Sequence, residues 1–209
     1  PGDQVMVLDG RGRAYVVKLV DIRLEEITGT VLKSERVDGE PTCQVTLYAA
    51  LTQREKFEWI LQKCTELGVS GFTPVITEPH QIRLLTKAAF TGQIWLKFDS
   101  GMNRLGASDP AALFALAQQA NLHLCGFMSH LACADEPQHP QNRMQAENFT
   151  ELCNGISPQT PKSLLNSAGL ISLPDCRFDT IRPGIALYGA EPLAYQPMGL
   201  TPVLKLTGE

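Results

Sequence analysis

The chain has 209 residues, a formal net charge of −4 at pH 7 and a hydrophobic share of 44%. This length accommodates one large domain or two small ones, and the apolar share is ordinary for a protein with a packed core. The slightly negative charge argues against a nucleic-acid binder of the strongly basic type. No apolar run reaches the roughly 18 residues that are needed to span a bilayer, so we expect no membrane partner.

The N-terminal sequence Pro1-Gly2-Asp3 has neither a basic start nor an apolar stretch, and we expect no secretion signal there. The six cysteines form no C-x-x-C pair, and we expect no bound metal. Scattered thiols of this kind are typical of reduced cysteines in the cytoplasm, which is where we expect the protein.

Residues 1–48 have the pattern of short β-strands. Asp9-Gly10 is a turn dipeptide that stops the first of them. Four runs are rich in β-branched or aromatic side chains, namely 4–8, 14–20, 26–32 and 43–48. Four short strands with tight turns predict a small antiparallel barrel or meander.

The periodicity changes after these strands. A helix is predicted over 53–67, ended by Gly68, and a short strand over 72–76. The apolar residues of the helix recur at helical spacing: Phe57, Ile60, Leu61, Cys64 and Leu67.

The segment Glu58–Val69, read Glu-Trp-Ile-Leu-Gln-Lys-Cys-Thr-Glu-Leu-Gly-Val, is similar to the small-subunit (16S) ribosomal RNA uracil-N3 methyltransferases. The resemblance covers about residues 1–78. It implies that 1–48 are a fragment of that family's RNA-binding, PUA-like β-barrel and that 49–78 begin its methyltransferase αβ segment. No later segment matches the family's motifs for S-adenosylmethionine, which we do not expect to bind. Ribosomal RNA is a possible partner of the basic strand residues, and a solvated strand face is the alternative.

From about residue 93, strand and helix patterns alternate. Asp109-Pro110 has the residue types of a helix N-cap and first turn. Strands are predicted at 94–98, 122–128, 163–165 and 185–188, and helices from 110 and over 141–153. Strands that alternate with helices of this length favour parallel βα units, in which the chemistry lies where the strands end.

Four motifs lie at or just past these strand ends: Trp95–Gly106 (Trp-Leu-Lys-Phe-Asp-Ser-Gly-Met-Asn-Arg-Leu-Gly), Met128–Asp135, Asn166–Gly169 and Ile181–Gly189. In this order they resemble the middle part of the fold-type III alanine racemases, which use pyridoxal phosphate (PLP). The resemblance covers about residues 93–209, and a junction is expected at 79–92. The expected fold class is therefore α/β, a small antiparallel β-barrel fragment followed by the parallel βα repeats of half a (β/α)8 barrel.

The resemblance implies a set of cofactor contacts. Ser167 and the backbone of Gly184 and Ile185 would bind the phosphate, which needs hydroxyl and backbone N–H groups free of obstructing side chains. Arg182 would face the pyridine nitrogen and keep it unprotonated, because a guanidinium does not give up its proton. The alternatives are a Ser and a Gly in ordinary turns and an Arg in a surface ion pair.

Three further roles follow from the same resemblance. Arg104 would bond the phenolic oxygen of the cofactor. Lys97 matches a lysine that is carbamylated in many members and orients that arginine; otherwise it is a strand residue with a solvated amine. His130 would pack near the ring in a supporting role, and a structural histidine is the alternative.

The proton-transfer groups of the family are missing from this sequence. The motif Lys-Ala-Asn-Ala-Tyr-Gly-His-Gly, whose lysine holds PLP, does not occur, and Tyr188 and Tyr195 do not match the tyrosine opposite it. That tyrosine belongs to a C-terminal domain that would begin where the chain ends at Glu209. These differences predict a hybrid that binds PLP weakly or non-covalently and is catalytically inactive.

Two alternatives stay open. The first is an alanine racemase that converts L-alanine to D-alanine as an oligomer or by complementation with another chain. A half barrel leaves open strand edges, through which a homodimer is possible. The second alternative is a ribosomal RNA-binding fragment of the methyltransferase family.

Overall fold

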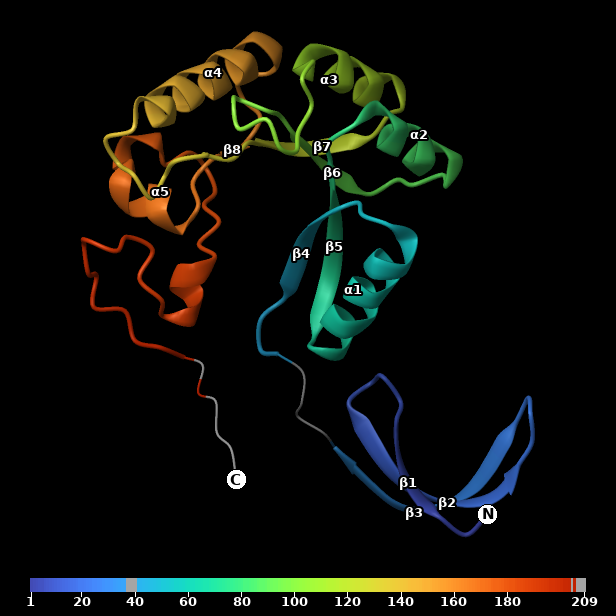
Figure 1. The fold of residues 1–209 in the computed structure, drawn as a ribbon. Helices are drawn as coiled ribbons and strands as arrows, with labels where there is room; N and C mark the ends of the chain where they lie inside the picture. The colour runs from blue at the N-terminus through green and yellow to red at the C-terminus, as the bar shows by residue number, and fades with distance from the viewer. Residues whose placement is uncertain (37–40, 204, 206–209) are drawn as a thin grey trace. The chain divides into compact units, whose positions relative to one another are not determined.

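The computed structural model describes residues 1–36, 41–203 and 205. The chain forms two compact units, one of Pro1–Thr46 with Leu61–Gly71 and the other of Leu47–Ile60 with Phe72–Glu209. They contain a three-stranded and a five-stranded sheet, shown along the chain in Figure 1. None of the helices in the described part of the chain is long and apolar enough to cross a membrane.

The three-stranded sheet has the order β1-β2-β3, with both pairs antiparallel. Its strands are β1 (Gln4–Leu8), β2 (Arg13–Ile22) and β3 (Ile27–Arg36), which confirms the first three predicted strands. The turn after β1 forms because the Asp9 carboxylate accepts hydrogen bonds from the Arg11 and Arg13 amides at 2.7 and 3.1 Å. The fourth predicted strand, 43–48, was wrongly assigned to this sheet, since it forms β4 (Val45–Ala50) of the other one.

The five-stranded sheet has the order β4-β5-β6-β7-β8. Its further strands are β5 (Val69–Ile76), β6 (Gln93–Lys97), β7 (His123–Met128) and β8 (Lys162–Ser163). The pairs β5–β6, β6–β7 and β7–β8 are parallel, and an isolated parallel bridge joins Ser163 to Thr180. This curled parallel sheet with its connecting helices confirms the predicted half barrel (Figure 1).

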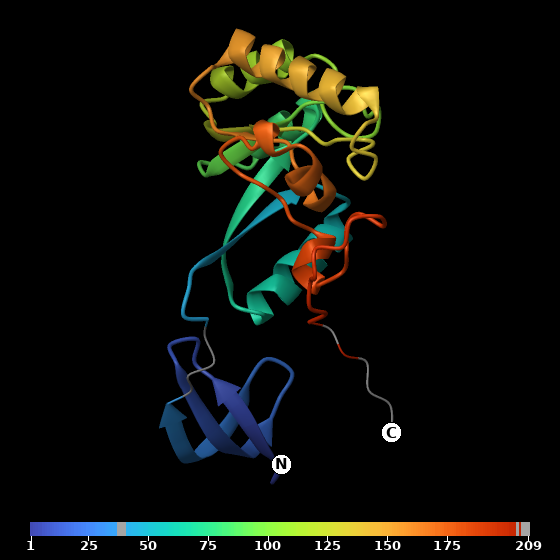
Figure 2. The same cartoon turned by 90° about the vertical axis from the view of Figure 1, so that its left-hand side faces the viewer.

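The helices α1 (Arg54–Glu66), α3 (Pro110–Gln119) and α4 (Pro140–Ile156) agree with the predicted ones. The Asp109 carboxylate caps α3 by accepting the Ala112 amide at 3.0 Å, as its position before Pro110 predicts. Views from two directions place α3 and α4 on the same side of β7 (Figure 1, Figure 2).

The expected junction at 79–92 contains a helix that the sequence patterns did not predict, α2 (Pro79–Lys87). Its buried Gln81 accepts hydrogen bonds from the Thr77 and Glu78 amides and donates one to the Leu51 carbonyl at 3.2 Å. Because Ile82 is also buried, the segment is a packed part of the βα arrangement rather than a free connection.

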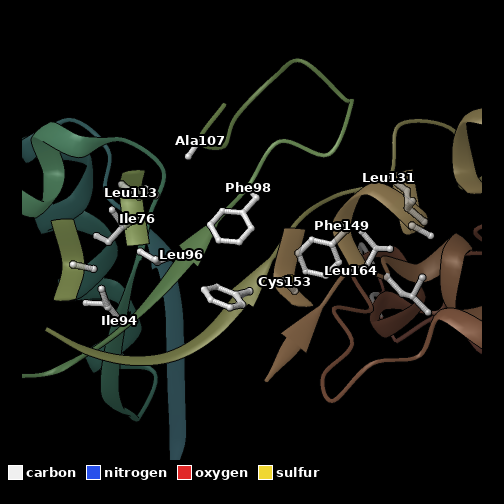
Figure 3. Packing of buried hydrophobic residues seen from close by; sticks show 14 of the residues in the cluster. Ile76, Ile94, Leu96, Phe98, Ala107, Leu113, Leu131, Phe149, Cys153 and Leu164 are labelled. Carbon is white, nitrogen blue, oxygen red and sulfur yellow. The ribbon is translucent and has the colours of Figure 1, made fainter. Parts of the chain in front are cut away.

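The main core lies between one face of the parallel sheet and the helices α2, α3 and α4. Ile94, Leu96 and Phe98 point to this face, and Figure 3 shows their side chains together with Phe149 of α4 and other residues of the same buried cluster. Since side chains alternate along a strand, Trp95 and Lys97 lie on the opposite, concave face, where Trp95 packs with Val75 and Met128.

The last predicted strand, 185–188, is wrong: these residues form the 3-10 helix η2 (Ile185–Tyr188). Gly189 ends it with a φ of 75°, in the left-handed region, and donates its amide to Ala186. A short apolar run does not by itself distinguish a strand from a helical turn. Two further short elements were not predicted, α5 (Ser167–Ser172) and the 3-10 helix η1 (Pro174–Cys176).

Candidate functional site

Polar and charged residues of three different strand regions meet at one edge of the parallel sheet. Lys97 is the last residue of β6, and Ser129 and His130 directly follow β7. Arg182 enters from the segment beside β8, where its amide donates to the Leu165 carbonyl at 2.9 Å. Because the strands are parallel, their carboxyl ends share this edge, as the sequence analysis expects.

Arg182 is the centre of this group. Its guanidinium donates hydrogen bonds to the Ser163 hydroxyl, to the Ser129 carbonyl and, at 3.2 Å, to the Leu164 carbonyl. Burial lowers the pKa of Arg182 to about 10, so the group keeps its charge at neutral pH. The planar cation is therefore fixed across the ends of two strands and is not part of a surface ion pair, which was the alternative interpretation.

His130 lies against this cation, with its Nδ1 3.4 Å from the Arg182 guanidinium. Its pKa is lowered to about 4, first by burial and then by the charges of Arg182, Lys97 and Arg104. The imidazole is therefore neutral at pH 7. Because a guanidinium can only donate, its contact with Nδ1 favours the tautomer that carries the ring proton on Nε2.

Lys97 is half-buried, and its pKa is lowered by the burial and then by the charges of Arg104 and Arg182, which Asp99 opposes. Arg104 is exposed, on the loop that follows β6. An unmodified Lys97 repels Arg104, so the orienting role that the resemblance implies for Lys97 stays a prediction.

The loop that carries Arg104 is held by hydrogen bonds from its backbone amides to the Asp99 carboxylate. The Asp99 carboxylate accepts the amides of Gly101, Met102 and Asn103 at 2.9, 2.9 and 3.1 Å. Gly106 has a φ of 145°. A Cβ there would lie 2.6 Å from the Phe98 carbonyl carbon, so the loop needs glycine to return to the sheet.

Ser167, Gly184 and Ile185 also come together. The buried Ser167 hydroxyl accepts the Ala186 amide at 3.2 Å, which places the backbone of 184–186 beside the start of α5. Gly184 and Ile185 are exposed, and a Cβ on Gly184 would meet nothing within 4 Å. The structure thus places a buried hydroxyl beside an exposed backbone with open space at Gly184, which suits a small anion.

The sequence patterns missed several residues that hold this site. The Ser129 hydroxyl donates to the Phe98 carbonyl at 2.9 Å and lies 2.8 Å from the Ser100 hydroxyl, and Ser163 donates to the Thr180 carbonyl at 2.9 Å. All three serines are buried at strand ends. The sequence feature that could have identified these residues is a serine at the end of an apolar run.

Lys97, His130 and Arg182 do not line the large cavity of the same unit. A cavity of about 920 Å³ lies nearby in the same unit, but its lining includes Asp99, Asp109 and Glu151, and its acidic character does not suit an anionic ligand. Among the described residues, no three His, Cys, Asp or Glu side chains are grouped as a metal ion requires.

The family model described as "Alanine racemase, N-terminal domain" matches residues 41–192 of this chain. Alanine racemase of Jannaschia sp. (strain CCS1) is 43% identical over 136 residues, which are 65% of this chain and 37% of the relative. Alanine racemase of Thioalkalivibrio sulfidiphilus is 38% identical over 209 residues, which are 95% of this chain and 56% of the relative. The chain therefore spans about half or less of the length of these curated relatives.

Solved structures agree with these matches. The biosynthetic alanine racemase of Pseudomonas aeruginosa has a TM-score of 0.60 and 33% identity, over 77% of this chain and 45% of that one. The alanine racemase of Bartonella henselae with covalently bound pyridoxal phosphate has a TM-score of 0.60 and 25% identity, over 80% of this chain and 46% of that one.

These matches extend further toward the N-terminus than the motifs did. The family model includes the residues assigned to the methyltransferase-like segment 49–78 and to the junction 79–92. The methyltransferase resemblance of 1–78 gains no support from them.

Proposed function

Because the chain belongs to the alanine racemase family, we propose that it binds PLP at the carboxyl ends of β6, β7 and β8 and takes part in the interconversion of L- and D-alanine. It does so as an oligomer or together with another chain. The observation that supports this most directly is the Arg182 guanidinium, bonded to residues after two strands and accompanied by His130, Lys97 and Arg104.

Ser167, Gly184 and Ile185 would hold the phosphate. Two of its requirements are present, a hydroxyl whose own proton is free to donate and an exposed backbone without a side chain above it. The hydroxyl is kept in place because its oxygen already accepts the Ala186 amide. The positive charges of Arg104 and Arg182 favour the same dianion from the side of the strand ends.

Arg182 and His130 would define the ring end of the site. Arg182 stays protonated at neutral pH, and a ring nitrogen that faces it stays unprotonated. His130 is neutral at the same pH and adds no charge to the ring face. When bound, PLP supplies an electron sink that eases removal of the α-proton of an amino acid, and an unprotonated ring moderates that effect.

The 209 residues of the chain do not contain the family's lysine motif. Without the family's lysine motif, binding rests on contacts to the phosphate and the ring, so we expect it to be weaker than in members that carry the motif. The hybrid origin, the catalytic inactivity of the isolated chain and the cytoplasmic location stay predictions of the sequence.

The test measures binding and turnover separately. Equilibrium dialysis against PLP would show saturable binding to the chain, strongly reduced in Arg182→Met and retained in Arg177→Met, an exposed arginine of the same unit. D-alanine formation from L-alanine is then followed over a range of protein concentrations, alone and with a family fragment that carries the lysine motif. Absence of D-alanine in every mixture with PLP bound would refute the racemase part of the proposal.

A further inference from the structure

One face of the three-stranded sheet (Figure 1) is mostly apolar. Val5, Val17 and Val31 are direct cross-strand partners, and such partners point to the same face of a sheet. Because side chains alternate along a strand, five more residues share this face. They are Val7, Tyr15, Leu19, Ile22 and Ile27. We call these eight residues the valine face.

The valine face is exposed to solvent. Five of its aliphatic side chains are exposed, from 37% for Val5 to 63% for Ile27. The opposite face is more polar, since it holds Lys18, Thr30 and Lys33. An apolar sheet face stabilises a fold when it packs against a second layer. The valine face is therefore the side of this sheet on which a second layer would bury apolar surface.

The end of the sheet that contains the turn after β1 is basic. Its described residues include three arginines, Arg11, Arg13 and Arg36. The acidic neighbours Asp9 and Glu35 already accept backbone amides and a lysine amine, respectively. Arg13 and Arg36 lie directly opposite each other, an arrangement that is unfavourable for like charges. This end therefore favours an anionic partner.

The other end of the sheet is acidic. Asp3 precedes β1, and Asp21, Glu25 and Glu26 lie around the turn after β2, where Arg23 pairs with Asp21 at 2.7 Å. A partner with one sign of charge, such as a nucleic acid, would be attracted to one end of the sheet and repelled by the other. The charges instead suit a partner that carries the same two ends.

We propose that two copies of this chain associate through their valine faces, with the basic end of each sheet over the acidic end of the other. A two-fold axis that lies in the interface and perpendicular to the strands produces this arrangement, and every contact then occurs twice. With the axis along the strands instead, like ends would meet and repel each other. The two sheets would pack as the layers of a β-sandwich, about 10 Å apart.

This surface is separate from the proposed cofactor site. The sheet lies outside residues 41–192, which the alanine racemase family model matches. The inference therefore does not depend on PLP binding, and an oligomer formed through the parallel-sheet unit would use a different contact.

The size of the valine face sets the strength of the contact. Strands of ten residues, spaced about 4.8 Å apart, give a three-stranded face roughly 33 Å long and 14 Å wide. Two such faces would bury on the order of 1,000 Å², which is near the lower limit for a specific interface. We therefore expect a weak dimer that dissociates on dilution into the micromolar range.

Sedimentation velocity of the full chain, from about 1 to about 200 µM, tests the association. The weight-average sedimentation coefficient should rise from that of a monomer to that of a dimer. Val7→Lys places a charge in the valine face and should weaken the association about tenfold or more. The control Met6→Lys, an exposed neighbour on the opposite face, should leave the association unchanged. Circular dichroism verifies that both variants fold.

Charge exchange tests the arrangement of the ends. Arg13→Glu with Arg36→Glu makes both ends acidic, and Glu25→Lys with Glu26→Lys makes both ends basic. Each double variant should associate with itself about tenfold more weakly at low salt, because like ends meet. An equimolar mixture of the two should associate at least as well as the unaltered chain, and high salt should reduce these differences.

The outcomes separate this surface from others. A chain that stays monomeric at every concentration would overturn the inference. So would a dimer that Val7→Lys leaves intact, or one that Met6→Lys weakens equally, and both results would leave the proposed function standing. If Val7→Lys misfolds, the exposed charge variants decide alone: a mixture that associates no better than its two components would refute the contact.

Discussion

Replacing Arg182 with methionine tests whether this guanidinium organises the strand ends. The side chain keeps much of its apolar stem but loses the hydrogen bonds to Ser163, Ser129 and Leu164. A hydrogen bond from a charged group contributes roughly 1.5–3 kcal/mol, while burying the charge costs several kcal/mol. The substitution removes the cost of burying the charge, but it also removes these hydrogen bonds and leaves two buried carbonyls without a donor. We therefore expect the free energy of unfolding to fall by about 2–4 kcal/mol.

The more specific readout is the pKa of His130, measured by NMR titration of its ring. In the unaltered chain we expect a value of about 4, with burial as the largest cause and Arg182 as the largest charge. Arg182→Met should raise the pKa clearly but leave it below 6.5, since the burial remains. The control Arg177→Met, at an exposed position, should change neither quantity. An unchanged His130 pKa in Arg182→Met would show that the two groups are not coupled, and the site as described would be wrong.

Three further changes address the loop and the pH response. Gly106→Ala should lower the free energy of unfolding by about 2–3 kcal/mol, because both the left-handed φ and the crowding around a Cβ disfavour alanine at this position. Urea denaturation measures the change. The control Gly155→Ala, on α4 where a Cβ meets nothing within 4 Å, should not destabilise the fold. Burial alone would raise the pKa of Asp99, but hydrogen bonds from three backbone amides outweigh the burial and lower the pKa. The ionised carboxylate therefore stabilises the fold above about pH 4, and this stabilisation is lost at lower pH. Asp99→Asn should reduce the fall in unfolding free energy below about pH 4. His130 has a lowered pKa, so stability should fall as the pH drops from 6.5 to about 4; His130→Gln should remove that fall and the exposed His123→Gln should keep it.

Much of the architecture follows from local patterns. Alternating strand and helix signals place β6, α3, β7 and α4, because a buried parallel strand and an amphipathic helix each carry their own period. Asp109 before a proline fixes the start of α3 for the same local reason. The motifs are enough to identify the cofactor-binding family, since they combine unusual residues in a fixed order.

Other features escaped the patterns because they depend on partners far along the chain. The run 43–48 reads as a strand in either sheet, and only the pairing with β5 decides which one it joins. The helix over 79–87 gains its stability from Gln81, whose amide reaches Leu51 thirty residues earlier. Residues 185–188 read as a strand, yet the glycine after them and the hydroxyl of Ser167 favour a helical turn.

The residue types of the site were determined by the sequence itself: arginines, a lysine, a histidine and a serine at predicted strand ends. Only the tertiary structure decided their electrostatics. Arg182 is bonded across the ends of β7 and β8, and this arrangement keeps His130 neutral and disfavours the charge on Lys97. The physical reason is that burial and charge repulsion depend on distances through space, which a linear pattern does not contain.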